Sequence, residues 1–156
     1  MKSLAVFVVF VLLSFSAAAI GSFSTRSGTR DWYPTLRKPS WTPPDRVFGP
    51  VWTVLYVCIA TAGFLVWRNA PAGGATLPMV FFAVQLLLNA AWSWVFFGLR
   101  QPGWALAELT LLWLAIAATT LVFFRICFWS GLLFVPYLLW VTFAGVLNFA
   151  IWRANA

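Results

Sequence analysis

The feature that most constrains this chain is a series of five long apolar runs separated by short polar connectors. A helix needs about 20 apolar residues to cross the hydrocarbon core of a bilayer, and each run comes close to that length. Backbone groups in lipid must be satisfied internally, and the runs lack the alternation of barrel strands, so helices are expected. The sequence therefore predicts an all-α integral membrane bundle, a single domain over 1–156. Its five transmembrane helices are predicted at 4–20, 47–67, 77–99, 104–124 and 132–152.

The composition agrees with a chain that lies mostly in lipid. Hydrophobic residues make up 63% of the chain and charged residues only 8%, against the ~25% charged residues of soluble domains. The first run, with Lys2 before it and Ala17 to Ala19 at its end, also has the pattern of a cleaved signal peptide. Cleavage would leave four helices and place both chain ends on one face, so a retained first helix is predicted.

The basic residues predict the orientation of the bundle. Three of the ten (Lys2, Arg68 and Arg125) fall on the face of the N-terminus, and the other seven fall on the opposite face. Basic residues accumulate on the cytoplasmic side of membrane proteins, so the N-terminus is expected outside and the C-terminus in the cytoplasm of a multi-pass protein, here of a bacterial membrane. The net charge of +7 then reflects topology and contact with anionic lipid headgroups, and no nucleic-acid partner is predicted.

The chain has few residues for conventional site chemistry. It contains no histidine, two cysteines and three acidic residues. These numbers do not provide a metal-ligand cluster or a Ser/His/Asp triad, so the sequence predicts no metal and no cofactor. Cys58 and Cys127 are too few and too apolar in context for a disulfide framework, and each is expected to be a small core residue.

Polar and aromatic residues from four predicted helices fall at similar depth, in the half of the bilayer next to the connector 24–46. They are Trp52 and Tyr56; Gln85, Asn89, Trp92 and Phe96 on one helical stripe; Glu108; and Trp140, Ala144 and Leu147. Polar groups inside a bilayer are costly and usually face a protein interior or a cavity. Two interpretations stay open: hydrogen bonds that hold the helices together, or a flat apolar pocket with a few polar anchors.

The connector 24–46 has a composition of its own at the water's edge of the second run, KPSWTPPDRVFGPVWTVLY. Proline fixes φ and keeps the preceding residue out of the helical region. Pro39, Pro43 and Pro44 therefore predict an extended, stiff segment, which we interpret as a lid over the pocket.

Three segments carry a resemblance to a known family: WTPPDRVFGPVWTVLY, QLLLNAAWSWVFFGLRQPGWAL and PYLLWVTFAGVLNFAIWR. Together they resemble the tryptophan-rich sensory protein/translocator protein family, also called peripheral benzodiazepine receptors, over about 21–155. The resemblance implies a five-helix bundle with an uncleaved first helix that forms homodimers. It also implies binding of porphyrins (protoporphyrin IX, with haem as a second candidate) and of isoquinoline carboxamide and benzodiazepine-type drugs in a pocket closed by the first connector.

The family's site residues carry over by motif. The resemblance implies a pocket lined by Tyr33, Pro43, Phe48, Trp52, Asn89, Trp92, Phe96, Trp140, Ala144 and Leu147. Trp52 and Trp140 match the tryptophans implicated where family members photo-oxidise protoporphyrin IX. The C-terminal cholesterol-recognition segment of animal members has a tyrosine where this chain has Phe149, so sterol recognition by that route is not predicted.

These observations lead to one functional hypothesis and two alternatives. The chain is predicted to be a membrane tetrapyrrole-binding protein that senses, protects against or disposes of porphyrins. Without histidine, a metal-free porphyrin or a haem held by apolar contact is expected. The alternatives are an enzyme that degrades protoporphyrin IX with light and oxygen, and a transporter of tetrapyrroles or sterols.

Overall fold

The computed structural model of the chain describes residues 2–156, and over that range it contains helices and no strand. Five helices in this range are long and apolar enough to cross a membrane, which confirms the predicted all-α membrane bundle. They are α1 (Lys2–Asp31), α2 (Asp45–Asn69), α3 (Thr76–Ser93), α4 (Pro102–Ile126) and α5 (Phe128–Asn155), with a 3₁₀ turn η1 (Tyr33–Thr35) and a π turn η2 (Trp94–Gly98) between them.

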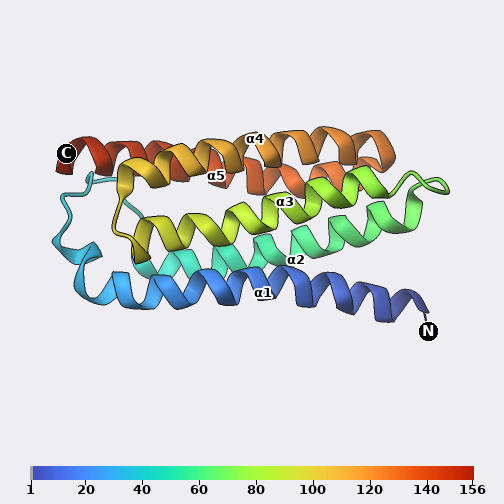
Figure 1. The fold of residues 1–156 in the computed structure, drawn as a ribbon, viewed down its shortest axis with the longest axis horizontal. Coiled ribbons are helices and arrows are strands. Elements are labelled where there is room, and N and C mark those ends of the chain that lie inside the picture. The colour runs from blue at the N-terminus through green and yellow to red at the C-terminus, as the bar shows by residue number, and fades with distance from the viewer. Residues whose placement is uncertain (1) are drawn as a thin grey trace.

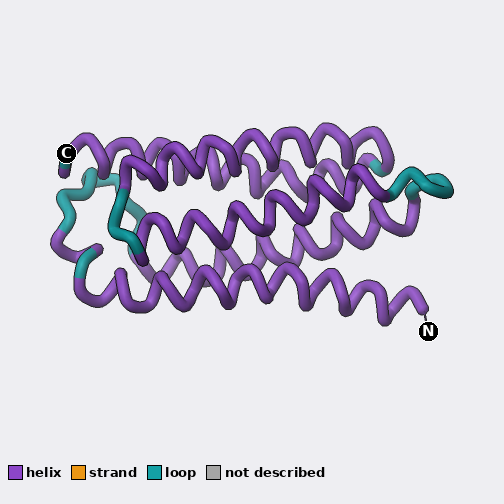
Figure 2. Tube along the Cα trace, viewed as in Figure 1, coloured by secondary structure: helices purple, strands orange, loops and turns teal. Residues whose placement is uncertain are grey.

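The helices lie lengthwise beside one another, so each connection falls at one of the two ends of the bundle (Figure 1). The N-terminal end of the chain, the α2–α3 turn and the α4–α5 junction lie at one end. The α1–α2 connector (32–44), the α3–α4 loop and the C-terminus lie at the other (Figure 2). We call the second the connector end. The two chain ends therefore lie at opposite ends of the bundle.

The first helix is longer than predicted, and the prediction that the connector begins at residue 24 was wrong. α1 continues to Asp31, whereas the apolar pattern had predicted that the helix ends near residue 20. The hydroxyls of Thr25 and Thr29 donate to backbone carbonyls four residues earlier, at 2.9 and 2.8 Å, so these polar residues are accommodated within the helix. Gly28 lies so close to Phe97 that an added Cβ would approach it to 2.8 Å. The polar residues thus mark where the helix leaves the apolar layer. Beyond that point α1 continues as a helix that packs against η2.

The other helix ends differ from the predicted ones by a few residues. α3 ends at Ser93, and the turn η2 replaces its predicted last residues. α4 begins at Pro102, a position that suits proline because the first helical N–H has no intrahelical partner. α5 begins at Phe128, four residues before the predicted start, directly after the extended residue Cys127.

The half of the bundle away from the connector end is filled by side chains. Ile59, Val66, Phe123 and Phe134 are each fully buried there. Gly63 lets α1, α2 and α3 approach, since a Cβ at this position would lie 2.7 Å from Phe82. Space inside the bundle is therefore found in the half next to the connector.

Candidate functional site

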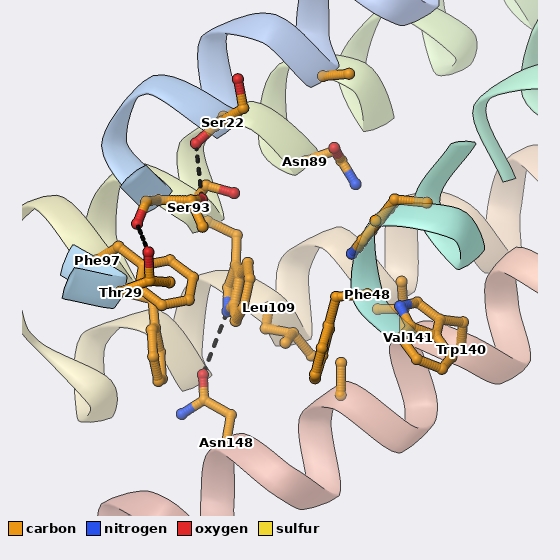
Figure 3. Close-up of a pocket in the computed structure, with 18 of the residues that line it drawn as sticks. Ser22, Thr29, Phe48, Asn89, Ser93, Phe97, Leu109, Trp140, Val141 and Asn148 are labelled. Carbon is orange, nitrogen blue, oxygen red and sulfur yellow. Dashed lines mark hydrogen bonds between the residues drawn. The ribbon is translucent and has the colours of Figure 1, made fainter. Parts of the chain in front are cut away.

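A cavity of about 630 Å³ lies between the helices near the connector end, and residues of all five helices line it (Figure 3). Cavities of about 300–1,000 Å³ with mostly apolar walls are typical of small-molecule sites. The walls here are mainly aromatic and aliphatic, with a few amide, hydroxyl and charged groups among them. The cavity thus has the size and the composition of a site for a flat, largely apolar molecule.

The structure brings together nine of the ten residues that the sequence proposed for the pocket. Tyr33, Phe48, Trp52, Asn89, Trp92, Phe96, Trp140, Ala144 and Leu147 all line the cavity. Pro43 is not among its lining residues: it lies in the extended approach to α2, directly before the helix-capping residue Pro44. Pro43 is therefore placed to shape the backbone of the connector rather than the wall of the cavity.

The sequence interpretation missed an entire wall. α1 contributes Phe15, Ala18, Ala19, Gly21, Ser22, Thr25, Arg26 and Thr29 to the cavity. Five of them, from Gly21 to Thr29, were overlooked because the helix was expected to end at residue 20, and the other three lie in the apolar run, where no polar or aromatic pattern distinguishes them. The spacing of Ser22, Thr25 and Thr29, three and four residues apart, was the available signal, since residues so spaced share one helical face.

Aromatic side chains close the cavity at the connector end. Trp92 and Phe96 stack with ring centroids 5.2 Å apart, and Trp32 and Tyr33 meet Phe96 edge-on at 5.6 and 6.3 Å. The ammonium of Lys38 donates to the backbone carbonyl of Tyr33 at 3.0 Å and lies 4.2 Å from the centre of its ring. Burial raises the pKa of the Tyr33 phenol, and the charge of Asp45 raises it further. Tyr33 is thus held as a neutral, packed lid residue.

Hydrogen bonds between three helices form the floor of the cavity. The hydroxyl of Tyr56 on α2 donates to Oδ1 of Asn89 on α3, and Nδ2 of Asn89 donates to the hydroxyl of Tyr137 on α5 at 2.9 Å. The indole of Trp52 covers this network, 5.5 Å from the Tyr56 ring and 6.1 Å from the Tyr137 ring. Asn89 therefore joins helices and also lines the cavity, so both sequence interpretations apply to it.

Two other polar residues of the predicted cluster do not reach the cavity. Gln85 is fully buried and donates to the backbone carbonyl of Phe82 at 2.9 Å. Both carboxylate oxygens of Glu108 are buried, and neither has a hydrogen-bond partner among the described residues. Neither side chain lines the cavity, so the interpretation of one polar stripe facing a pocket was too broad.

Asn148 forms a second polar link that the sequence interpretation did not identify. Nε1 of Trp92 donates to Oδ1 of Asn148 at 3.2 Å, the bond drawn in Figure 3, and Nδ2 of Asn148 donates to the carbonyl of Pro102 at 2.7 Å. The pair ties α3, the start of α4, and α5 together beside the cavity. An asparagine within an apolar run was a usable signal, because buried polar groups in membranes have partners or line cavities.

The wall formed by α5 combines a large side chain with a small one. The indole of Trp140 meets Phe48 of α2 edge-on, with ring centroids 5.8 Å apart, and lies tilted against Phe143 of its own helix at 5.5 Å, so it spans the space between α5 and α2. Ala144 lies one turn further along and also lines the cavity. A flat molecule could lie against the indole over the small side chain.

Nothing in the described part of the chain assembles a metal site. No group of three or more His, Cys, Asp or Glu side chains lies together among the residues described. Cys58 and Cys127 are both free thiols. The chemistry offered by the cavity is therefore that of aromatic faces, hydroxyls, amides and two charged groups, Arg26 and Asp45.

The five spans define a multi-pass membrane protein whose helices enclose a ligand-sized cavity at one end of the bundle. The sequence model of the TspO/MBR family matches residues 8–153, and the chain belongs to that family. This match confirms the resemblance found in the sequence.

Curated relatives cover most of the chain. It is 44% identical over 128 residues to the human translocator protein, covering 80% of this chain and 75% of the human one. It is 43% identical over 125 residues to the tryptophan-rich sensory protein of Cereibacter sphaeroides, covering 80% and 77%. It is also similar to protein CrtK of Rhodobacter capsulatus, 39% identical over 154 residues, covering 98% and 94%.

Proposed function

We propose that the protein binds protoporphyrin IX or a related tetrapyrrole of the haem pathway within the membrane, for sensing, protection or disposal of porphyrins. The observation that carries the proposal is the cavity of about 630 Å³ lined by tryptophans of neighbouring helices, Trp52 on α2 and Trp140 on α5. Flat aromatic ligands gain from stacked and edge-on contact with such rings. The names of two relatives, translocator protein and tryptophan-rich sensory protein, are compatible with this role.

A light-dependent enzyme is the second candidate function. Trp52, Tyr56 and Tyr137 form a contiguous group of oxidisable side chains at the floor of the cavity, joined by ring contacts of 5.5 and 6.1 Å. Such a group favours electron exchange with an excited porphyrin, with dioxygen as the oxidant. The described cavity contains no histidine or cysteine for acid–base or nucleophilic chemistry, so radical chemistry is the form of catalysis that suits it.

A transporter of tetrapyrroles or sterols is less compatible with the packing. In the described residues, the half of the bundle away from the connector is closed by Ile59, Phe123 and Phe134, each 0% exposed. A ligand of porphyrin size would need these helices to separate in order to pass. Homodimer formation and binding of isoquinoline carboxamide or benzodiazepine-type drugs stay predictions from the family resemblance.

Titration of the purified protein with protoporphyrin IX tests the proposal. In the dark, we expect saturable quenching of tryptophan fluorescence, because the ligand would lie against Trp52 and Trp140. We also expect an isoquinoline carboxamide to reverse the quenching by competition. Quenching that rises linearly with ligand and resists the competitor would reflect partition into detergent and would contradict the proposal.

The same samples under light and oxygen separate binding from catalysis. If the protein only binds the porphyrin, the porphyrin absorbance should decay no faster with the protein than in detergent alone. If decay is accelerated, Trp52→Phe and Trp140→Phe should each slow it while changing dark affinity by less than about tenfold, ~1.4 kcal/mol. Phenylalanine retains most of the apolar contact but lacks the easily oxidised indole.

The proposed orientation places the connector and the C-terminus in the cytoplasm. In a background without Cys58 and Cys127, we expect cysteines at Ser40 and Ala156, both exposed, to react with a membrane-impermeant maleimide only after cells are opened. A cysteine at Ala72, exposed in the α2–α3 turn, serves as the opposite control and should react in intact cells. Labelling of Ser40 and Ala156 from opposite sides would contradict the five-span topology.

A further inference from the structure

The cavity has an opening on its side, between α1 and α2. Three of its lining residues on α1, spaced three and four apart, are exposed, and three on α2, spaced four apart, are exposed as well. We call these two edges the lateral mouth. Its residues are Ala19, Ser22 and Arg26 on α1 and Asp45, Gly49 and Thr53 on α2.

Small and polar side chains keep the lateral mouth open. A Cβ added at Gly49 would meet no atom within 4 Å, so no side chain of α1 reaches across to α2 at this level. Closer to the middle of the bundle, the rings of Phe15 and Tyr56 lie 5.9 Å apart and end the opening. The lateral mouth therefore begins at the connector end and stops at the floor of the cavity.

Arg26 is the one basic residue among the described residues that line the cavity. It lies on α1 beyond the apolar run, near the polar end of the span. The structure gives its guanidinium no hydrogen-bond or ion-pair partner in the described chain. A guanidinium stays charged and offers planar, paired donors that match a carboxylate. Asp45, the one acidic lining residue described, lies on the opposite edge of the lateral mouth.

We propose that Arg26 is a specificity-determining residue that binds the carboxylate of an amphiphilic acid whose flat apolar body lies in the cavity. The inference rests on the proposed function and adds to it the charge and the orientation of the ligand. Burial of the apolar body against Trp52 and Trp140 leaves the acid group at the lateral mouth, where water and lipid headgroups spare it full desolvation. Asp45 repels a carboxylate from the α2 edge, so the acid group faces α1.

The test compares protoporphyrin IX with its dimethyl ester, which has the same ring and no charge, in the dark. The measured quantity is the ratio of the two affinities in each protein, because partition of the ester into detergent cancels when proteins are compared. In Arg26→Gln we expect this acid-to-ester preference to fall about three- to tenfold, as suits a partly exposed charged hydrogen bond. Arg26→Lys should retain part of the preference.

Arg30→Gln is the matched control. Arg30 is exposed on the same end of α1, carries the same charge and does not line the cavity. We expect its acid-to-ester preference to equal that of the unchanged protein, which would exclude a general effect of net charge. An equal loss of preference in both variants would overturn the role of Arg26.

The remaining outcomes separate this inference from the function on which it rests. If the unchanged protein binds neither compound saturably, the proposed function fails, and the inference fails with it. If it binds both and Arg26→Gln keeps the full preference for the acid, the role of Arg26 is overturned while porphyrin binding stands. An equal loss of affinity for acid and ester in Arg26→Gln would also overturn it, since a neutral ester does not need the charge.

Discussion

Replacement of Ala144 by phenylalanine is expected to weaken protoporphyrin IX binding more than tenfold and to shift the melting temperature by only a few degrees. Ala144 lines the cavity one turn from Trp140, so a benzyl group there would occupy the space where a ligand would lie against the indole. Filling a cavity differs from overpacking a filled core, which costs about 1–3 kcal/mol of stability. Affinity and melting temperature measured on one detergent-purified sample distinguish a cavity wall at Ala144 from a filled core.

Two further variants on α5 sharpen this test. Val146 is 56% exposed on the outer surface of the helix, so Val146→Phe adds a ring facing lipid and should bind normally. Ala144→Thr adds less volume, and its hydroxyl can bond back to the carbonyl four residues earlier and bend the helix slightly. It should weaken binding several-fold, between the unchanged protein and Ala144→Phe. A variant Ala144→Phe that melts much earlier yet binds normally while folded would show that Ala144 is packed core.

The bundle itself could be predicted because bilayer thickness imposes a length on each apolar run. The end of α1 could not be predicted, because the prediction relied on apolarity and this helix continues for several residues after its sequence becomes polar. Ser22, Thr25 and Arg26 are too polar for the hydrocarbon core of a bilayer, and for that reason they were expected outside the first helix. In the structure they are helical, with Thr25 bonded to the carbonyl of Gly21 and Gly28 in close contact with Phe97. That contact joins residues distant in sequence and leaves no local pattern.

The cavity could be predicted in part, because the depth of a residue along its helix shows which residues of the other helices lie at the same level. Asn89, Trp52 and Trp140 were placed at similar depth and do line one space. Helical rise does not show at which depth the cavity ends: Gln85, on the same stripe as Asn89, lies one turn further from the connector end, beyond the floor of the cavity, and bonds to its own helix. Depth also does not give the rotation of a helix: Leu109 and Leu112 of α4 line the cavity, whereas Glu108, at a similar depth, does not.

Replacement of Asn89 by leucine is expected to lower both stability and binding. The amide of Asn89 accepts from the hydroxyl of Tyr56 and donates to that of Tyr137, and leucine can do neither. Interhelical hydrogen bonds in membranes often contribute only ~0.6 kcal/mol, but a buried polar group left without a partner costs about 1–3 kcal/mol. Tyr56 borders the cavity and could bond to water there. Tyr137 is 0% exposed and could not, so its hydroxyl should dominate the cost.

A double-mutant cycle in detergent tests which hydroxyl carries the loss. Tyr137→Phe alone should cost less than Asn89→Leu, because it removes the hydroxyl together with its bond. Tyr137→Phe added to Asn89→Leu should recover about 1 kcal/mol or more of the loss, since the unpartnered group is then gone. Tyr56→Phe in the same background should recover little. Equal recovery of stability from both tyrosine variants would mean that water does not reach Tyr56. No recovery from either would mean that the bulk of leucine, and not the loss of hydrogen bonds, destabilises the floor of the cavity.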